Sequence, residues 1–276
     1  MTQKLCIYHG NCLDGFTAAW IVRKALGDIE FFAGYYQNPP PDVTDKDVYI
    51  VDFSYKRPVM EELAKKANKI IHIDHHASAI IDMQGFDAIE KYYSEDNSAS
   101  GAMLCWRYFF PETEPIDLVK SVDDRDRWAF KIPGTREVQA SIFSYEYTFE
   151  NWDMLASLPI TQLENEGKAI DRKHFKDIKE LVGAMTRRMN IAGYNVPVIN
   201  VPYTLGSDAG NILAKNEPFS AYYYEKKDRV EFGLRSDSKN PDAIDVSKIA
   251  VMFGGGGHKN AAGFSVSFEV AKKFQD

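Results

Sequence analysis

The sequence has few cysteines and no long apolar run. Its three cysteines, Cys6, Cys12 and Cys105, form neither an even framework nor a CxxC pair, which argues against a disulfide scaffold or a zinc ribbon. No apolar stretch approaches the roughly 20 residues that span a bilayer, so we expect no membrane partner. Because the N-terminus leads directly into an apolar strand pattern, we expect no cleaved export signal. These absences favour a reducing, cytoplasmic location.

The sequence also lacks an excess of positive charge. Lysine and arginine number 33 against 40 acidic residues, and the formal net charge is −7 over 276 residues. Proteins that bind long nucleic acid normally carry a basic patch or domain, so we expect no long duplex nucleic acid as a partner. Small phosphate esters stay open as ligands, because bound cations reverse the local charge of an acidic site.

Short apolar runs alternate with helical patterns through the first half of the chain. Runs that end near residues 9, 52 and 74 are separated by helical patterns at about 16–26 and 58–67. This βαβ order predicts an α/β fold with a mostly parallel sheet and helices on its faces. Further along we expect a strand near 86–92, a helix start within 97–100 capped by Ser or Asn, and a helix near 116–128.

The pattern changes in the second half. Residues from about 159 to 189 are charged, contain no internal proline after Pro159 and carry apolar residues at helical spacing, which predicts a long helix. Strand patterns at 196–201, 221–225 and 230–235 and a short helix at about 245–252 follow. We therefore expect an α/β catalytic domain over 1–158, a connecting helix over 159–192 and a smaller α+β domain over 193–276, with the active site in the cleft between the domains.

Three predicted strands end in side chains that bind metals. One strand ends at His9, another at Asp52, and a third runs into Asp74-His75-His76. The carboxyl ends of parallel strands share one edge of a sheet, so these side chains should meet there. A single His or Asp at a strand end could equally serve the core or a turn, whereas adjacent histidines after a buried strand have few structural uses.

Two further segments add acidic side chains. Asp14 stands before Gly15 at a strand-to-helix turn, where it could bind a cation or cap the helix. The segment 123–128 contains three aspartates, and any one of them could also be a solvated helix end. Carboxylates mixed with imidazole suit manganese, magnesium or iron better than structural zinc, which prefers thiolates. The inventory is sufficient for two metal ions, a pair that would activate water for phosphoryl displacement.

These motifs resemble those of the DHH phosphoesterases, a family named for the triplet that stands here as Asp74-His75-His76. The segment 9–15, with its histidine, aspartate and glycine, is similar to the first motif of the family. Asp52 stands in the second motif, and Asp124 with Trp128 resembles the fourth. The resemblance covers nearly the whole chain.

The resemblance implies a set of metal ligands: His9, Asp14, Asp52, His75 and Asp124. It further implies two Mn²⁺ ions, with Mg²⁺ or another divalent ion as the alternative, and makes Asp52 the bridging ligand. Asp74 would orient the site, and His76 would face the substrate phosphate. The family commonly has a second acid in the first motif, where this chain has Asn11 or Cys12. The first metal site could therefore be weaker, hold another ion or include Cys12, which could also be a bystander.

A glycine-rich segment near the C-terminus resembles the phosphate-binding loop of the DHH-associated domain. It reads Gly254-Gly-Gly-Gly-His258 and continues through a small-residue turn. Exposed backbone amides in such a loop can cradle phosphate. The expected substrate-binding residues are Gly255, Gly256, Gly257, His258 and, upstream, Arg235. Arg235 could also be an ordinary surface residue of a strand.

The function that the resemblance implies is that of a metal-dependent hydrolase acting on ester bonds. The expected activity is cleavage of phosphodiester bonds in short oligonucleotides or dinucleotides, as in an oligoribonuclease or exonuclease, by two-metal activation of water. One alternative is a phosphatase of 3′-phosphonucleotides, the bisphosphorylated nucleosides. Another is a non-catalytic nucleotide-binding sensor derived from such an enzyme. The sequence leaves a homodimer open.

Overall fold

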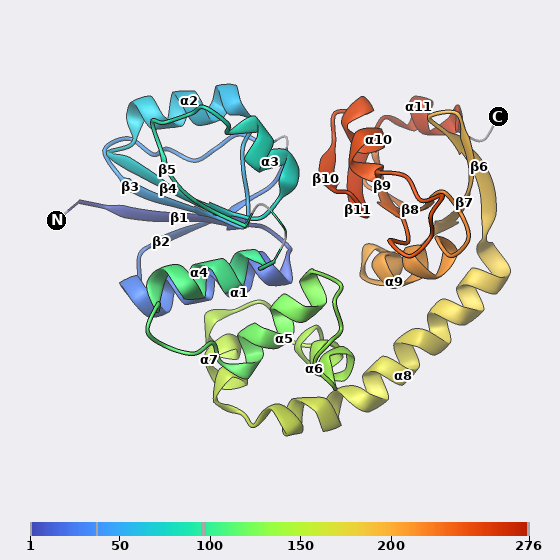
Figure 1. Ribbon diagram of the computed structural model, residues 1–276, viewed down its shortest axis with the longest axis horizontal. Coiled ribbons are helices and arrows are strands. Elements are labelled where there is room, and N and C mark those ends of the chain that lie inside the picture. Colours follow the sequence, from blue (N-terminus) through green and yellow to red (C-terminus); the bar gives the residue numbers. More distant parts are fainter. Residues whose placement is uncertain (1, 37, 95, 97, 275–276) are drawn as a thin grey trace. The chain divides into compact units, whose positions relative to one another are not determined.

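The computed structural model describes residues 2–36, 38–94, 96 and 98–274. The chain separates into two compact units, residues 1–171 and 172–276, each with its own sheet (Figure 1). The division falls inside helix α8 (Ile160–Met185), which is the helix expected from the sequence near 159–189.

The N-terminal unit is built on an all-parallel sheet with the strand order β2-β1-β3-β4-β5. Helices cover both faces of this sheet, with α2 and α3 on one face and α1 and α4 on the other (Figure 1). The strands are β1 (Lys4–His9), β2 (Glu30–Gly34), β3 (Asp47–Val51), β4 (Lys69–Asp74) and β5 (Glu90–Tyr93). The covering helices are α1 (Leu13–Leu26), α2 (Arg57–Lys66), α3 (Ala77–Asp82) and α4 (Gly101–Phe109).

Burial on both faces explains why these strands are continuous apolar runs rather than alternating patterns. In β4, all residues from Ile70 to Asp74 are buried. One hydrophobic core includes residues of α1 and α4, and another includes Met60 and Leu63 of α2. The predicted α/β fold with a mostly parallel sheet is confirmed. Helix α1 begins three residues earlier than expected, which places Asp14 in its first turn.

Three shorter helices complete the N-terminal unit: α5 (Asp117–Asp126), α6 (Thr135–Ile142) and α7 (Phe149–Ser157). Of these, only α5 was expected from the sequence. The expected cap within 97–100 is Ser100, whose side chain accepts a hydrogen bond from the amide of Met103 at the start of α4. Asn97, the other cap candidate, lies outside the described residues.

The C-terminal unit contains a mixed sheet with the order β10-β11-β9-β8-β7-β6, in which only β7 and β8 pair in parallel among the described strands. Its strands are β6 (Arg187–Ile191), β7 (Tyr194–Asn200), β8 (Ser220–Glu225), β9 (Val230–Arg235), β10 (Gly256–His258) and β11 (Ala261–Val266). Its helices after α8 are α9 (Tyr203–Leu213), α10 (Val246–Met252) and α11 (Phe268–Lys272).

Strand β6 corrects the expected end of the long helix, which we placed near Met189. The helix stops at Met185, and β6 then pairs antiparallel with β7. Met189 and Ile191 are buried while Asn190 between them is exposed. This period of two is the pattern of a strand with one buried face, and it overrides the helical spacing before it.

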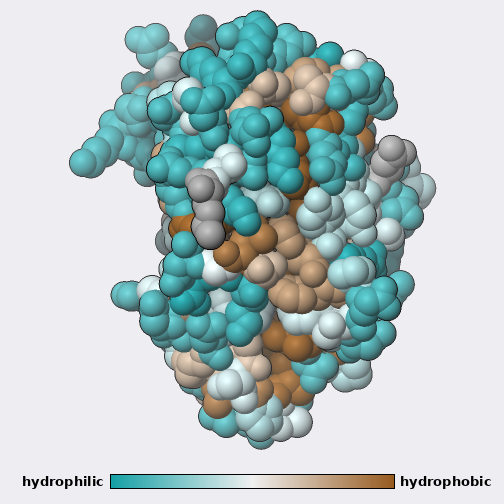
Figure 2. All heavy atoms as spheres, turned by 90° about the vertical axis from the view of Figure 1, so that its left-hand side faces the viewer, coloured by the Kyte–Doolittle hydropathy of each residue, from teal (hydrophilic) through white to brown (hydrophobic). Residues whose placement is uncertain are grey.

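None of the described helices has both the length and the apolar character needed to cross a membrane. Figure 2 views the molecule from the left-hand side of Figure 1, and most of that face is hydrophilic, with apolar residues in smaller patches.

Candidate metal centre

The candidate site lies where the strand order of the parallel sheet changes direction. Strand β2 lies on one side of β1 and strand β3 on the other, and open α/β sheets bind ligands at such switch points, outside the carboxyl ends of their strands. His9 ends β1, and Asp52 directly follows β3. The Nδ1 atom of His9 is 3.6 Å from Oδ2 of Asp52, so these two strand ends meet as expected.

Asp52 is the centre of the group. Its backbone has a left-handed φ of 52°, a conformation that aspartate tolerates better than most residues. Its amide donates to the carbonyl of Ile73 at 2.9 Å, which holds the bend against β4. The carboxylate is buried, and burial alone would raise its pKa. The hydrogen bond with His75 and the nearby imidazole of His9 outweigh burial and lower the pKa of Asp52 below its ordinary value.

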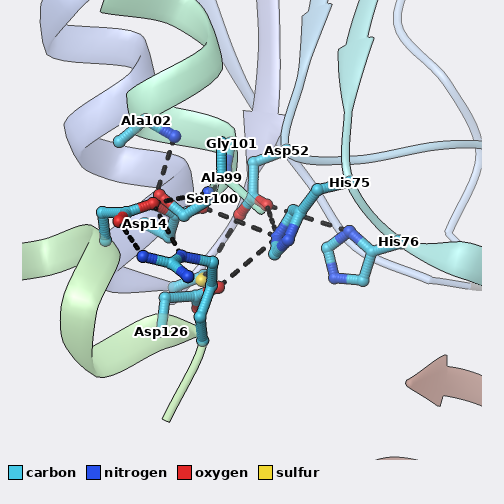
Figure 3. A network of polar contacts seen from close by, with 12 residues as sticks. Asp14, Asp52, His75, His76, Ala99, Ser100, Gly101, Ala102 and Asp126 are labelled. Carbon is cyan, nitrogen blue, oxygen red and sulfur yellow. Dashed lines mark hydrogen bonds and ion pairs between the residues drawn. The ribbon is translucent and has the colours of Figure 1, made fainter. Parts of the chain in front are cut away.

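His75 is surrounded by carboxylates. Its Nε2 atom is 3.1 Å from Oδ1 of Asp52, 3.5 Å from Oδ2 of Asp126 and 3.7 Å from Oδ2 of Asp14. Figure 3 shows these side chains pointing toward one another, with the ring of His76 beside that of His75. Sequence segments far apart in the chain therefore converge on one buried imidazole.

Asp14 does not cap its own helix and instead lies at the N-terminus of α4. Its carboxylate accepts hydrogen bonds from the hydroxyl of Ser100 (2.7 Å) and from the amides of Gly101 (2.6 Å) and Ala102 (3.1 Å). The partial positive charge of a helix N-terminus favours a carboxylate at this position. Gly101 is required there, because a Cβ atom would lie 2.5 Å from Cβ of Asp52.

The clustered carboxylates repel one another. Burial, and then the charges of Asp52 and Asp126, raise the pKa of Asp14 well above its ordinary value. The surrounding protein and the charge of Asp52 also raise the pKa of Asp126, although its side chain is 28% exposed. Burial lowers the pKa of His75, but its carboxylate neighbours outweigh this effect and raise it well above the ordinary value. A divalent cation would relieve this excess of negative charge.

The donor atoms form two neighbouring groups that suit metal ions. His9, Cys12 and Asp52 make one group, and Asp14, His75 and Asp126 make another, with the donor atoms of each group within 4.8 Å of one another. The buried Nδ1 atom of His9 has no hydrogen-bond partner among the described residues. An imidazole nitrogen without a partner, next to clustered carboxylates, fits a metal site.

Asp74 holds the two histidines in place. One of its carboxylate oxygens accepts hydrogen bonds from the backbone amides of His75 (2.7 Å) and His76 (3.1 Å), and it lies 2.7 Å from Nδ1 of His76. Burial alone would raise the pKa of Asp74, but His76 and His72 lower it well below its ordinary value. An ionised Asp74 is thus in contact with both residues that follow it.

The glycine-rich segment of the C-terminal unit forms part of an antiparallel pair. Gly257 has a φ of 138°, and a Cβ atom on it would lie 2.6 Å from the carbonyl oxygen of Ala261 on β11. His258, at the end of β10, is half-buried. Arg235 donates to the carbonyl of Leu234 and to the hydroxyl of Ser207, each at 2.8 Å. Close packing of β10 on β11 is therefore one physical reason for glycine in this segment.

No family model matches the chain. Two curated relatives are uncharacterized protein R106 of Acanthamoeba polyphaga mimivirus, 29% identical over 95% of this chain and 67% of the relative, and oligoribonuclease NrnB of Bacillus subtilis, 23% identical over 97% and 74%.

Two solved structures share the fold. The pGpG-specific phosphodiesterase PggH from Vibrio cholerae has a TM-score of 0.52 and 14% identity, covering 98% of this chain and 95% of that one. RecJ from Thermus thermophilus, in complex with Mn²⁺, has a TM-score of 0.57 and 13% identity, covering 99% and 51%. NrnB, PggH and RecJ belong to the DHH superfamily, whose sequence motifs this chain resembles.

One expected ligand, Asp124, lies away from this group. The carboxylate of Asp124 accepts hydrogen bonds from the amides of Lys131 (2.8 Å) and Ile132 (3.0 Å) and from the hydroxyl of Thr135 (2.7 Å). It thereby anchors the loop between α5 and α6. Asp126, which we did not select from the sequence, faces His75 instead.

Helix geometry explains the difference. Two residues along an α-helix correspond to a rotation of about 200°, so Asp124 and Asp126 point to different sides of α5. Asp123, Asp124 and Asp126 are close in sequence and chemically equal, and no pattern in the sequence selects among them. The position of α5 against the sheet edge decides which one reaches His75.

Proposed function

We propose that this protein is a metal-dependent phosphodiesterase that hydrolyses short oligonucleotides or dinucleotides. The observation that carries the proposal is the convergence of Asp14, Asp52 and Asp126 on His75, next to a second donor group that shares Asp52. The Bacillus subtilis relative is an oligoribonuclease, which supports this substrate class. PggH, which shares the fold, is specific for the dinucleotide pGpG, and this agrees with the same substrate class.

We assign the metal ligands as His9, Asp14, Asp52, His75 and, in place of Asp124, Asp126. Two bound divalent ions, preferably Mn²⁺ with Mg²⁺ as the alternative, would supply a hydroxide at neutral pH and neutralise the phosphate. The Mn²⁺ complex of RecJ, which shares the fold, supports the choice of ion. Asp52 lies in contact with His9 on one side and with His75 on the other, so it is the residue suited to bridge.

We place His76 next to the reacting phosphate, and Asp74 behind it as the residue that orients His76. Burial lowers the pKa of His76, but the charge of Asp74 and the hydrogen bond to it raise the pKa above the ordinary value. A protonated His76 can donate a hydrogen bond to a phosphate oxygen and stabilise the charge that develops there. Asp74 positions His76 through the contact with Nδ1.

The C-terminal unit supplies contacts to the substrate away from the scissile bond in this proposal. Gly255, Gly256, Gly257 and His258 would contribute amides and an imidazole, and Arg235 a guanidinium, all suited to a phosphate. We propose that the substrates are about two to five nucleotides long, in line with the short substrates that the names of NrnB and PggH give for those proteins. We also propose a cytoplasmic location, because the three cysteines are free thiols.

A substrate panel tests the proposal. The protein is incubated with Mn²⁺ and dinucleotides, short RNAs, long single-stranded RNA or bisphosphorylated nucleosides, and products are separated by chromatography. We expect fastest cleavage of substrates of about two to five nucleotides. Release of inorganic phosphate from bisphosphorylated nucleosides alone would replace the proposal with the phosphatase function. Tight nucleotide binding without turnover would replace it with the sensor function.

A further inference from the structure

Cys12 has a place in the fold that packing does not explain. Cys6 and Cys105 are fully buried members of a hydrophobic core, whereas Cys12 is partly exposed and belongs to no core cluster of the described residues. It occupies the N-cap position of α1. Its Sγ atom lies 3.5 Å from Oδ2 of Asp52, to which the thiol can donate a hydrogen bond.

The same carboxylate oxygen faces His9. Nδ1 of His9 is 3.6 Å from Oδ2 of Asp52 and, although buried, has no hydrogen-bond partner among the described residues. Sulfur, nitrogen and oxygen donors thus lie within 4.8 Å of one another. The convergence of these three kinds of donor atom is the observation that points to an ion at this place.

We propose that Cys12 is a metal ligand and that the two metal positions of this centre prefer different ions. The position next to His9 would combine a thiolate, an imidazole and the shared carboxylate of Asp52. The donor group of Asp14, His75 and Asp126 combines one imidazole with two carboxylates. This inference rests on the proposed two-metal function and deepens it.

The chemistry of the donors sets the preference. Thiolate ligands select softer ions such as Zn²⁺, Co²⁺ and Fe²⁺, whereas carboxylates suit Mn²⁺ and Mg²⁺. When the ion binds, the sulfur of Cys12 supplies the electron pair of the new bond and its proton passes to solvent. The thiolate then contributes the negative charge that a second carboxylate would contribute at this position. The centre would therefore hold one softer and one harder ion when both kinds are present.

Cobalt spectroscopy tests the proposal without any turnover measurement. Metal-free full-length protein is titrated with Co²⁺, and the near-ultraviolet region is searched for the charge-transfer absorption that marks a cobalt–thiolate bond. We expect this absorption in the wild type and its loss in Cys12→Ser, a change that keeps a good N-cap residue. Cys105→Ala is the matched control and should keep the absorption, because that sulfur lies in the core.

A replacement by aspartate sharpens the test. Cys12→Asp should bind Co²⁺ without the charge-transfer absorption and should shift the Co²⁺ over Mn²⁺ preference toward Mn²⁺ by about tenfold or more, the lower end of what a change in the surroundings of a metal costs in affinity. Circular dichroism confirms the fold of each variant. Absorption that persists in Cys12→Ser, or cobalt bound to the wild type without this absorption, would overturn the inference.

The outcomes separate this inference from the proposed function. A wild type that shows the cobalt–thiolate absorption but cleaves no phosphodiester would contradict the function and leave Cys12 as a ligand. A wild type that cleaves dinucleotides but shows no such absorption would contradict only the role of Cys12.

Discussion

In the N-terminal unit three carboxylates crowd one buried imidazole, whereas in the C-terminal unit an acidic side chain of similar size is surrounded by partners of opposite charge. Glu231 on β9 accepts hydrogen bonds from Ser265 (2.6 Å) and Arg229 (2.7 Å) and pairs with Lys226 at 3.0 Å. For Asp14, Asp52 and Asp126, the cationic groups that act on the carboxylates are His75 and neighbouring histidines. The charge of Glu231 is balanced by protein groups, whereas the carboxylates of the N-terminal unit are arranged in groups that could hold a metal ion.

Glu231 therefore contributes to stability, whereas the arrangement of the aspartates around His75 is suited to a chemical role. Burial of like charges and a left-handed backbone at Asp52 both cost folding free energy, the latter on the order of 1–3 kcal/mol. Such costs are typical of functional sites. The following substitutions test whether the two units differ in this way.

The largest effect is expected from Asp52→Ala. This change removes the carboxylate that contacts both donor groups, and electrostatic stabilisation supplies most of the acceleration in phosphoryl transfer. We expect turnover of the best dinucleotide substrate to fall by about a thousandfold or more, with an unchanged circular dichroism spectrum. A folded Asp52→Ala protein with near-normal turnover would be incompatible with a two-metal centre.

Gly101→Ala should weaken metal binding, although Gly101 is not itself a proposed ligand. The added methyl group would lie 2.5 Å from Cβ of Asp52 and 2.9 Å from Oδ2 of Asp14, so both carboxylates would have to move. We expect loss of bound metal, measured by mass spectrometry after dialysis.

Gly183→Ala in α8 is the matched control, because a Cβ atom there meets nothing within 4 Å. It should keep its metal and gain up to about 1 kcal/mol of stability. Equal metal content in the two alanine variants would show that the space beside Asp52 is not critical.

His258→Ala should affect substrate binding and spare the metals. Loss of one hydrogen bond to a charged phosphate is worth about 1.5–3 kcal/mol, so the Michaelis constant should rise by roughly ten- to a hundredfold with little change in turnover number. The exposed neighbour Lys259 provides the control variant Lys259→Ala. If His258→Ala instead lost its metals, the division of roles between the two units would be wrong.

The smallest expected effects are changes in the free energy of unfolding, and they should have opposite signs for a carboxylate of the C-terminal unit and one of the N-terminal unit. In metal-free protein at pH 7, Glu231→Gln should lower the free energy of unfolding by about 1 kcal/mol. Asp126→Asn should raise it, because the raised pKa of Asp126 means that its ionised form destabilises the fold. Urea unfolding measures both changes. A loss of stability in both variants would contradict the contrast between the units.

The pH dependence of the free energy of unfolding provides a second test of the role of Glu231. Burial raises the pKa of Glu231, but Ser265, Arg229 and Lys226 outweigh it, so the pKa lies below the ordinary value. Its contribution is therefore complete above the unfolded-state pKa of about 4.3 and is lost as the pH falls through the lower folded-state value. The difference between wild type and Glu231→Gln should accordingly vanish in acid.

Topology alone determines part of the candidate site, and that part could be predicted from the sequence. His9, Asp52 and His75 meet as expected, because strand ends of a parallel sheet share an edge and the apolar runs indicated the strands. The proximity of Asp126 rather than Asp124 to His75 could not be predicted, because it depends on how α5 packs. The environment of Asp14 could not be predicted either, since the start of α4 that binds it is 87 residues away in sequence.

The count of bound metal ions tests the central claim most directly. Wild type, Asp52→Ala, Asp126→Asn and Asp124→Asn are dialysed against Mn²⁺ and Co²⁺, and total metal per chain is measured by mass spectrometry. We predict two ions in the wild type and in Asp124→Asn, and fewer in Asp52→Ala and Asp126→Asn. A single ion in the wild type, or two ions in Asp52→Ala, would contradict a centre built on Asp52.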